Sequence, residues 1–255
     1  MNEILREKFR ENYRPLWEKF LCDLQNTNVE NCPLPHLPVC GNFYNSNNYK
    51  PIAFIGIDTI GSCGLQHYLE DNVESVIDEW NSEFGDDVKY LSWARQYNFW
   101  KFIFHFLSEL YNVKLEDMKK VENEYIKEIL QSFIWANVNS IERFDITAEK
   151  KGVVKENWEK VKNASLIFDN AYNIIKVFSP KVMIVLNWGA KEEWFKHGFQ
   201  EIEGPTILSE NLKYFFIGDT NTHIYWTKHP RYLLTIGFEK IINEILVSFI
   251  SKNCF

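Results

Sequence analysis

Two short runs of apolar residues constrain the fold of this chain more than any other feature of its sequence. They span residues 52–57 and 181–187 and are rich in Ile and Val. Each has the length of a strand buried on both faces, which is typical of a parallel sheet. The first leads straight into a loop that carries Asp58, Gly61 and Gly64. This combination is typical of an α/β active site, because ligands bind beyond the carboxyl ends of parallel strands.

The size and composition of the chain favour one large α/β domain. It has 255 residues, of which 45% are apolar, and this is enough for a full core and excludes a disordered chain. No linker rich in Pro, Ser or Gly divides it. We therefore expect residues 1–50 to form an N-terminal helix and an irregular arm packed on the core, and residues 51–255 to form the α/β domain. The net charge of −7 argues against a broad basic surface but leaves room for a local one.

The five cysteines indicate a reducing, cytoplasmic setting with free thiols. Their number is odd, none forms a C-x-x-C pair, and no signal peptide precedes them. Their spacing also argues against zinc or an iron–sulfur cluster, so we expect no metal and no cofactor. Apolar runs are too short to span a membrane, and we expect a monomer with no membrane partner.

Helical and strand patterns alternate along the chain. Helices are predicted at 2–25, with a break at Pro15, and at 90–111, 157–178 and 232–251. Strands are predicted at 52–57, 133–139, 181–187, 213–217 and 223–227, the last two joined by a turn at Gly218. Alternation of this kind predicts a three-layer α/β sandwich around a central, mostly parallel four-stranded sheet.

Polar residues follow three of the predicted strands. Asp58 follows the first, Asn137 the second, and His229 lies just after the last. Because the carboxyl ends of parallel strands meet at one edge of a sheet, we expect the three side chains to lie close together. An acid, an amide and a histidine at one edge can act on a bond of a small planar ligand.

Four motifs in this order resemble the uracil-DNA glycosylase superfamily. The segment Gly56-Ile57-Asp58, with the Gly-rich loop after it, is similar to the family's water-activating motif. Residues 133–139 resemble its strand that ends in the base-reading Asn, and residues 184–189 its third core strand. Residues 223–230 resemble its last strand and the His-Pro loop. The matches lie between residues 51 and 232.

This resemblance implies base-excision DNA repair by hydrolysis of an N-glycosidic bond. A uracil or another damaged base is flipped out of DNA into a pocket at the carboxyl edge. Asp58 would activate water, His229 would stabilise the leaving base, and Asn137 would bind its edge through a donor and an acceptor. The remaining residues expected at the site are Gly56 and Ile57 on its wall, Tyr68 as an aromatic floor, and Arg231 on a phosphate.

The chain departs from the family's motifs in two places, which keeps other functions open. Thr59 and Ile60 stand where the family has Pro and Tyr, and Arg231 and Tyr232 follow His229-Pro230 in place of Ser-Pro. One alternative is a protein of the same fold that binds a base or nucleotide without cleaving it. Another is an α/β hydrolase of small nucleosides.

Structural roles compete with each functional assignment. Asp58 is also a suitable cap for a helix or turn. Asn137 can bond a loop backbone instead of a ligand, and His229 can be a turn residue.

Overall fold

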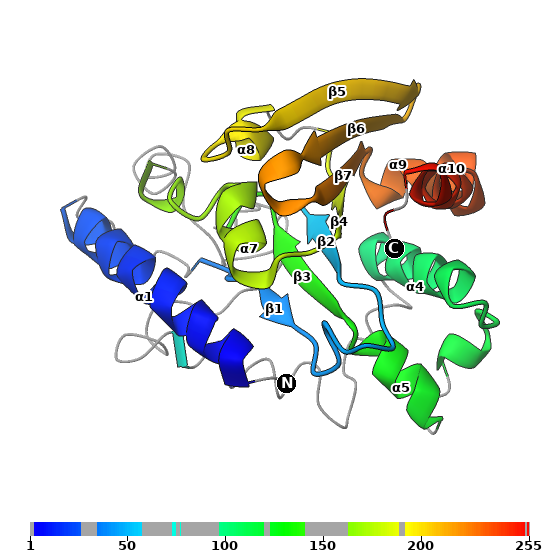
Figure 1. Ribbon diagram of the computed structural model, residues 1–255, viewed down its shortest axis with the longest axis horizontal. Helices are drawn as coiled ribbons and strands as arrows, with labels where there is room; N and C mark the ends of the chain where they lie inside the picture. Colours follow the sequence, from blue (N-terminus) through cyan, green and yellow to red (C-terminus); the bar gives the residue numbers. More distant parts are fainter. Residues whose placement is uncertain are drawn as a thin grey trace, which may run out of the picture.

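A computed structural model describes residues 3–26, 35–57, 73–74, 77, 97–119, 123–140, 163–188, 192–252 and 254 (Figure 1). In this part of the chain, seven strands form one sheet in the order β1-β3-β2-β4-β7-β6-β5. Their bounds are β1 Val39–Cys40, β2 Ile52–Gly56, β3 Phe133–Asn137, β4 Val182–Leu186, β5 Ile202–Ser209, β6 Leu212–Ile217 and β7 Thr222–Thr227.

The centre of the sheet is a block of four parallel strands. β2 pairs with β3 on one side and with β4 on the other, and β4 pairs with β7, in each case in parallel. Every residue of these four strands is buried. Burial on both faces explains why β2, β3 and β4 are nearly continuous apolar runs, as the sequence predicts.

The prediction of a four-stranded sheet is wrong, because the sheet has seven strands and is mixed. The hairpin β6–β7 adds β6 antiparallel to the parallel block, and β5 pairs antiparallel with β6. On the other side, β1 from the N-terminal arm pairs antiparallel with β3. Sequence periodicity misses β1 and β5 because β1 has two residues and β5 is an edge strand with mostly exposed side chains.

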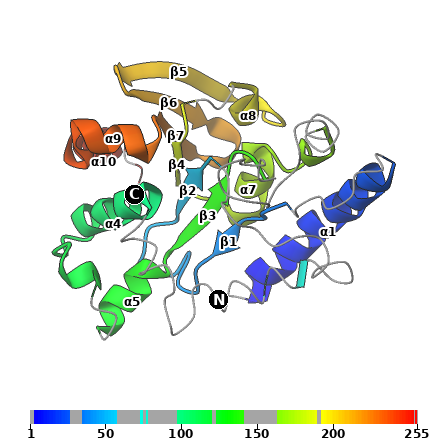
Figure 2. The same ribbon diagram turned by 180° about the vertical axis from the view of Figure 1, so that it is seen from behind.

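Helices lie on both sides of the sheet (Figures 1 and 2). α4, α9 and α10 contact one another on one side, and α7 contacts α1 and α8 on the other. The described helices are α1 Glu3–Gln25, α4 Asn98–Leu110, α5 Glu124–Leu130, α7 Ala171–Phe178, α8 Glu192–Lys196, α9 Pro230–Ile236 and α10 Phe238–Ser251. Within the described ranges, none of these helices has the length and hydropathy needed to cross a membrane.

Helix boundaries differ from the predicted ones at three places. α1 continues through Pro15, because its buried aromatic face outweighs the one hydrogen bond that proline removes. The segment predicted as one helix at 157–178 is interrupted, and α7 begins only after Asn170, whose side chain caps it. The closing helix is divided into α9 and α10 at Gly237, which has φ +86° and ψ 124°.

Gly237 provides a test of the fold. We expect Gly237→Ala to lower the free energy of unfolding by about 1–3 kcal/mol, since an L residue is strained in this backbone conformation. The measurement is chemical denaturation, with Asn243→Ala on the exposed side of α10 as the matched control. Equal stability of the two variants would show that the break does not depend on glycine.

Candidate functional site

The carboxyl ends of β3, β2, β4 and β7 define the candidate site. The chain passes from β2 to β3 on one side and then crosses to β4 and β7 on the other. The strand order therefore reverses at β2 and β4, and such a switch point leaves a crevice at the carboxyl edge of the sheet. Gly56, Asn137 and Thr227 end three of these strands, so the edge collects polar groups from segments far apart in the sequence.

Gly56 and Asn137 are paired residues of β2 and β3. A Cβ atom at position 56 would lie 2.7 Å from the Asn137 amide oxygen and 3.3 Å from a ring atom of Phe99. The glycine thus makes room for a buried amide beside an aromatic ring. The ladder continues for two more bonds, since the N–H groups of Val138 and Asn139 donate to the carbonyls of Gly56 and Ile57 at 3.0 and 2.9 Å. Ile57 lies at this edge next to Gly56.

Phe99 is a candidate site residue that sequence reasoning missed. Its ring is half-buried at the start of α4 and lies 6.4 Å from the ring of Trp135 in β3. The sequence places Phe99 within an aromatic stretch of the helix predicted at 90–111, where aromatic residues at helical spacing are expected to be core residues. Its proximity to Gly56 is a property of how α4 packs against β2.

His36 of the N-terminal arm lies against the same strand. Its backbone N–H donates to the Ser140 carbonyl at 2.6 Å, and its ring lies 4.6 Å from the ring of Trp135. Burial lowers the pKa of His36 to about 4. The buried Nδ1 atom of His36 and the buried hydroxyl of Ser140 have no hydrogen-bond partner in the described structure. Ser140 is also held from the other side, because its N–H donates to Asp169 at 2.7 Å.

His229 occupies the position between β7 and α9. It is the N-cap of α9, with Pro230 at the first helical position, and its Nδ1 accepts a hydrogen bond from the Arg231 N–H at 3.1 Å. An imidazole that accepts at Nδ1 carries its proton on Nε2 when it is neutral. Burial, and secondly the charge of Arg231, lower the pKa of His229. The residue is therefore a neutral imidazole with an Nε2–H donor near pH 7.

Lysines and aromatic rings gather at the ends of β4 and β7. Trp188, two residues after the end of β4, stacks on Trp226 of β7 with ring centroids 5.5 Å apart. The Lys213 ammonium of β6 lies 4.8 Å from the Trp188 centroid and 4.5 Å from that of Trp226. The Lys228 ammonium lies 4.2 Å from the centroid of Tyr232. Two described lysine ammonium groups are therefore held beside aromatic rings near His229.

Two predicted site residues, Asp58 and Tyr68, lie outside the described residues. The others are described: Gly56, Ile57, Asn137 and His229 stand at or just beyond the carboxyl ends of parallel strands, and Arg231 is exposed on α9. Gly56 and Asn137 are brought together from two different strands, and His229 is hydrogen-bonded to the backbone of Arg231. In the described part of the chain, no cluster of His, Cys, Asp and Glu is suited to a metal ion.

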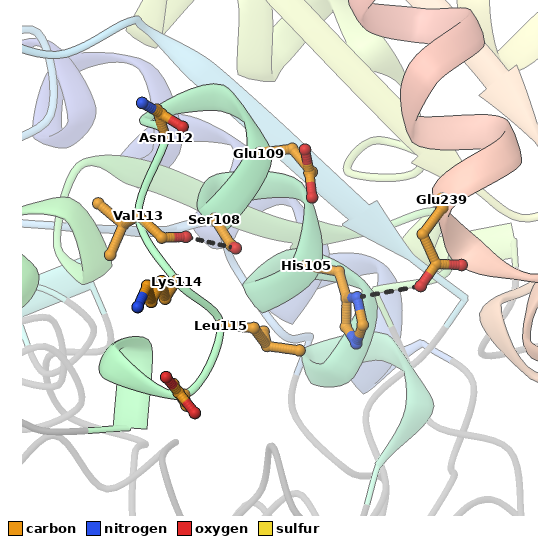
Figure 3. A pocket seen from close by; sticks show the side chains of 9 residues that line it. His105, Ser108, Glu109, Asn112, Val113, Lys114, Leu115 and Glu239 are labelled. Carbon is orange, nitrogen blue, oxygen red and sulfur yellow. Dashed lines mark hydrogen bonds and ion pairs between the residues drawn. The ribbon is translucent and has the colours of Figure 1, made fainter.

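Two cavities among the described residues lie elsewhere. A groove of about 670 Å³ runs beside the C-terminal half of α4, where His105 lies 4.0 Å from Glu239 of α10 (Figure 3). A second cavity of about 460 Å³ includes Pro51, Lys181 and Asn221, which directly precede β2, β4 and β7 at the amino edge. Neither contains a residue predicted for the site, so size alone does not identify the site here.

Comparisons of the chain with protein-family models, with curated proteins and with solved structures found no match. The resemblance to the uracil-DNA glycosylase superfamily thus stays a prediction from the four motifs. What the edge can do chemically follows from its own geometry: a buried amide and an aromatic ring suit a planar heterocycle, and a neutral histidine can donate to a developing anion.

The pKa of His36 predicts how stability changes with pH. The folded-state pKa of about 4 lies below the ordinary value of 6.5, so the unfolded chain takes up this proton first. We expect the free energy of unfolding to fall between pH 6.5 and 4, by on the order of 1–3 kcal/mol from this group. His36→Gln should flatten this decline in denaturation curves recorded across the range. The control His197→Gln, at an exposed position after α8, should leave it unchanged.

Proposed function

We propose that this protein is a DNA glycosylase-like hydrolase that cleaves the N-glycosidic bond of uracil or another damaged base. The observation that carries the proposal is the pairing of Gly56 with Asn137 beside Phe99 at the switch point of the sheet. The parallel block with helices on both sides supports the uracil-DNA glycosylase-like, three-layer architecture that the motifs imply.

Base recognition is assigned to Asn137 and Phe99. The amide of Asn137 offers a donor and an acceptor, which matches the edge of a pyrimidine ring. The Phe99 ring, 3.3 Å from the Cβ position of Gly56, offers an apolar face on which a base can stack. Phe99 takes the role of aromatic floor for which the sequence suggested Tyr68.

Bond cleavage is assigned to His229 and Asp58. Breaking the bond leaves positive charge on the sugar and negative charge on the departing base. The Nε2–H of neutral His229 is a donor for that anion, and the positive charge of Arg231 beside it also favours negative charge on the departing base. Asp58 follows β2 within two residues of Gly56; a carboxylate there can orient the attacking water and stabilise the sugar cation.

The direct test is release of free base from uracil-containing oligonucleotides, single-stranded and duplex. We expect wild type to release uracil, and Asp58→Asn and His229→Ala to slow release by about 10²–10⁴-fold while remaining folded. His197→Ala is the control for loss of a histidine at an exposed position. No release from uracil, hypoxanthine, xanthine or thymine-mismatch DNA would contradict the hydrolase.

The same assay separates the two alternatives. Tight binding of uracil DNA with no release selects a base-binding protein. Turnover of free nucleosides, with none of DNA, selects a hydrolase of small substrates.

Gly56→Ala tests the assignment of Asn137. The added Cβ would meet the end of a side chain, the Asn137 amide oxygen at 2.7 Å, so the amide moves and the sheet stays intact. We expect base release to fall by at least about tenfold, while the free energy of unfolding changes by less than about 2 kcal/mol. Release at the wild-type rate would show that the amide position does not matter. A matched control is Gly218→Ala, where the Cβ meets the Glu201 side chain beyond the opposite edge.

A further inference from the structure

The lysines and rings at the ends of β4 and β7 form a surface that the four motifs do not predict. We call Trp188, Lys213, Trp226, Lys228 and Tyr232 the lysine–aromatic patch. Lys213 belongs to β6, where it pairs with Trp226, and β6 is one of the antiparallel strands beyond the parallel block. The patch thus extends from the segment around His229 across β7 to β6.

Each ammonium of the patch lies over aromatic rings. Lys213 lies within 4.8 Å of the centroids of both stacked Trp rings, and Lys228 lies 4.2 Å from Tyr232 and 5.9 Å from Trp188. These contacts fix the long side chains at the surface beside the rings. Among the described residues, the Glu192 carboxylate lies close enough for Lys196 first, and Lys213 after it, to lower its pKa; Lys196 bonds that carboxylate directly at 2.7 Å.

The rings keep accessible surface. Tyr232 is 41% exposed, and Trp188 is half-buried with Trp226 beneath it. A surface with fixed positive charges and open aromatic rings suits a flexible polyanion whose units carry flat rings. Single-stranded nucleic acid has both properties, because its phosphates pair with lysine and its unpaired bases stack on aromatic side chains.

We propose that the lysine–aromatic patch binds a single strand of DNA next to the nucleotide whose base enters the site. A base adjacent to that nucleotide stacks on Tyr232, and the backbone phosphates lie along Lys228 and Lys213. The choice of DNA rests on the proposed function. Beyond the proposed function, the patch indicates that the substrate is an unpaired strand. It also makes β6 part of the surface that binds this strand.

The test uses fluorescence anisotropy of a labelled oligothymidylate, which contains no uracil and is bound without turnover. We expect Lys213→Gln and Lys228→Gln each to weaken binding several-fold and to reduce the slope of log K against log salt by about 0.7. Tyr232→Ala should weaken binding about tenfold, whereas Tyr232→Phe keeps the ring and the affinity. A duplex of the same length should bind more weakly than the single strand.

A matched control is available at the other edge of the sheet. Lys252 also places its ammonium over a tyrosine, 4.1 Å from the ring centroid of Tyr214. Lys252→Gln removes the same charge from the same kind of contact and should leave strand binding unchanged. Equal weakening by Lys252→Gln would overturn the proposal, and so would patch variants that bind the strand as tightly as wild type. It would also be overturned if polyglutamate competed as well as unlabelled oligothymidylate, or if the protein bound no strand at low salt.

Binding and cleavage fail independently in these assays. A wild-type protein that binds oligothymidylate through the patch but releases no base would contradict the hydrolase and leave the patch supported. If wild type releases base but the patch variants bind oligothymidylate as tightly as wild type, the hydrolase is supported and the patch is contradicted.

Discussion

The buried parallel ladder of β3, β2, β4 and β7 is the constraint on which the rest of this structure depends. All four strands are covered on both faces, and each fully buried Ile, Val or Phe contributes on the order of 1.5–3 kcal/mol relative to exposure. A shift in register would place Gly56 opposite a different residue of β3. The amide of Asn137 would then lose the space that the missing Cβ provides. The same strand register therefore determines both the packing of the core and the geometry of the edge.

Electrostatics at this edge favours a negatively charged ligand. Partial burial and the charge of Arg231 lower the pKa of the half-buried His229, while Lys213 and Lys228 are held over aromatic rings. In a chain of net charge −7, these two described lysines place positive charge at this edge, where the proposed leaving group and the strand would lie. Local charge of this kind raises the concentration of an anionic ligand near the site, even though the protein as a whole is acidic.

The sequence predicts the parallel block well and the added strands poorly. Apolar runs such as residues 181–187 can be recognised because burial on both faces leaves no polar positions. β5 has no such signal, since it is exposed and its place depends on pairing with β6. The ends of strands point to Asn137, which ends an apolar run, and to His229, which lies two residues beyond β7. Phe99 and Lys213 join the edge through helix packing and antiparallel register, and neither is encoded in local spacing.

Photocrosslinking of a single strand that contains iodouracil tests the central claim most directly. The halogenated base is activated in the bound state, and the attached peptide is identified by mass spectrometry. The account predicts a crosslink to Phe99 when the iodouracil occupies the site, and a crosslink near Trp188 or Tyr232 in a second strand that carries the iodouracil at the adjacent nucleotide. Crosslinks confined to the groove beside α4, around Glu109 and Asn112, would contradict it.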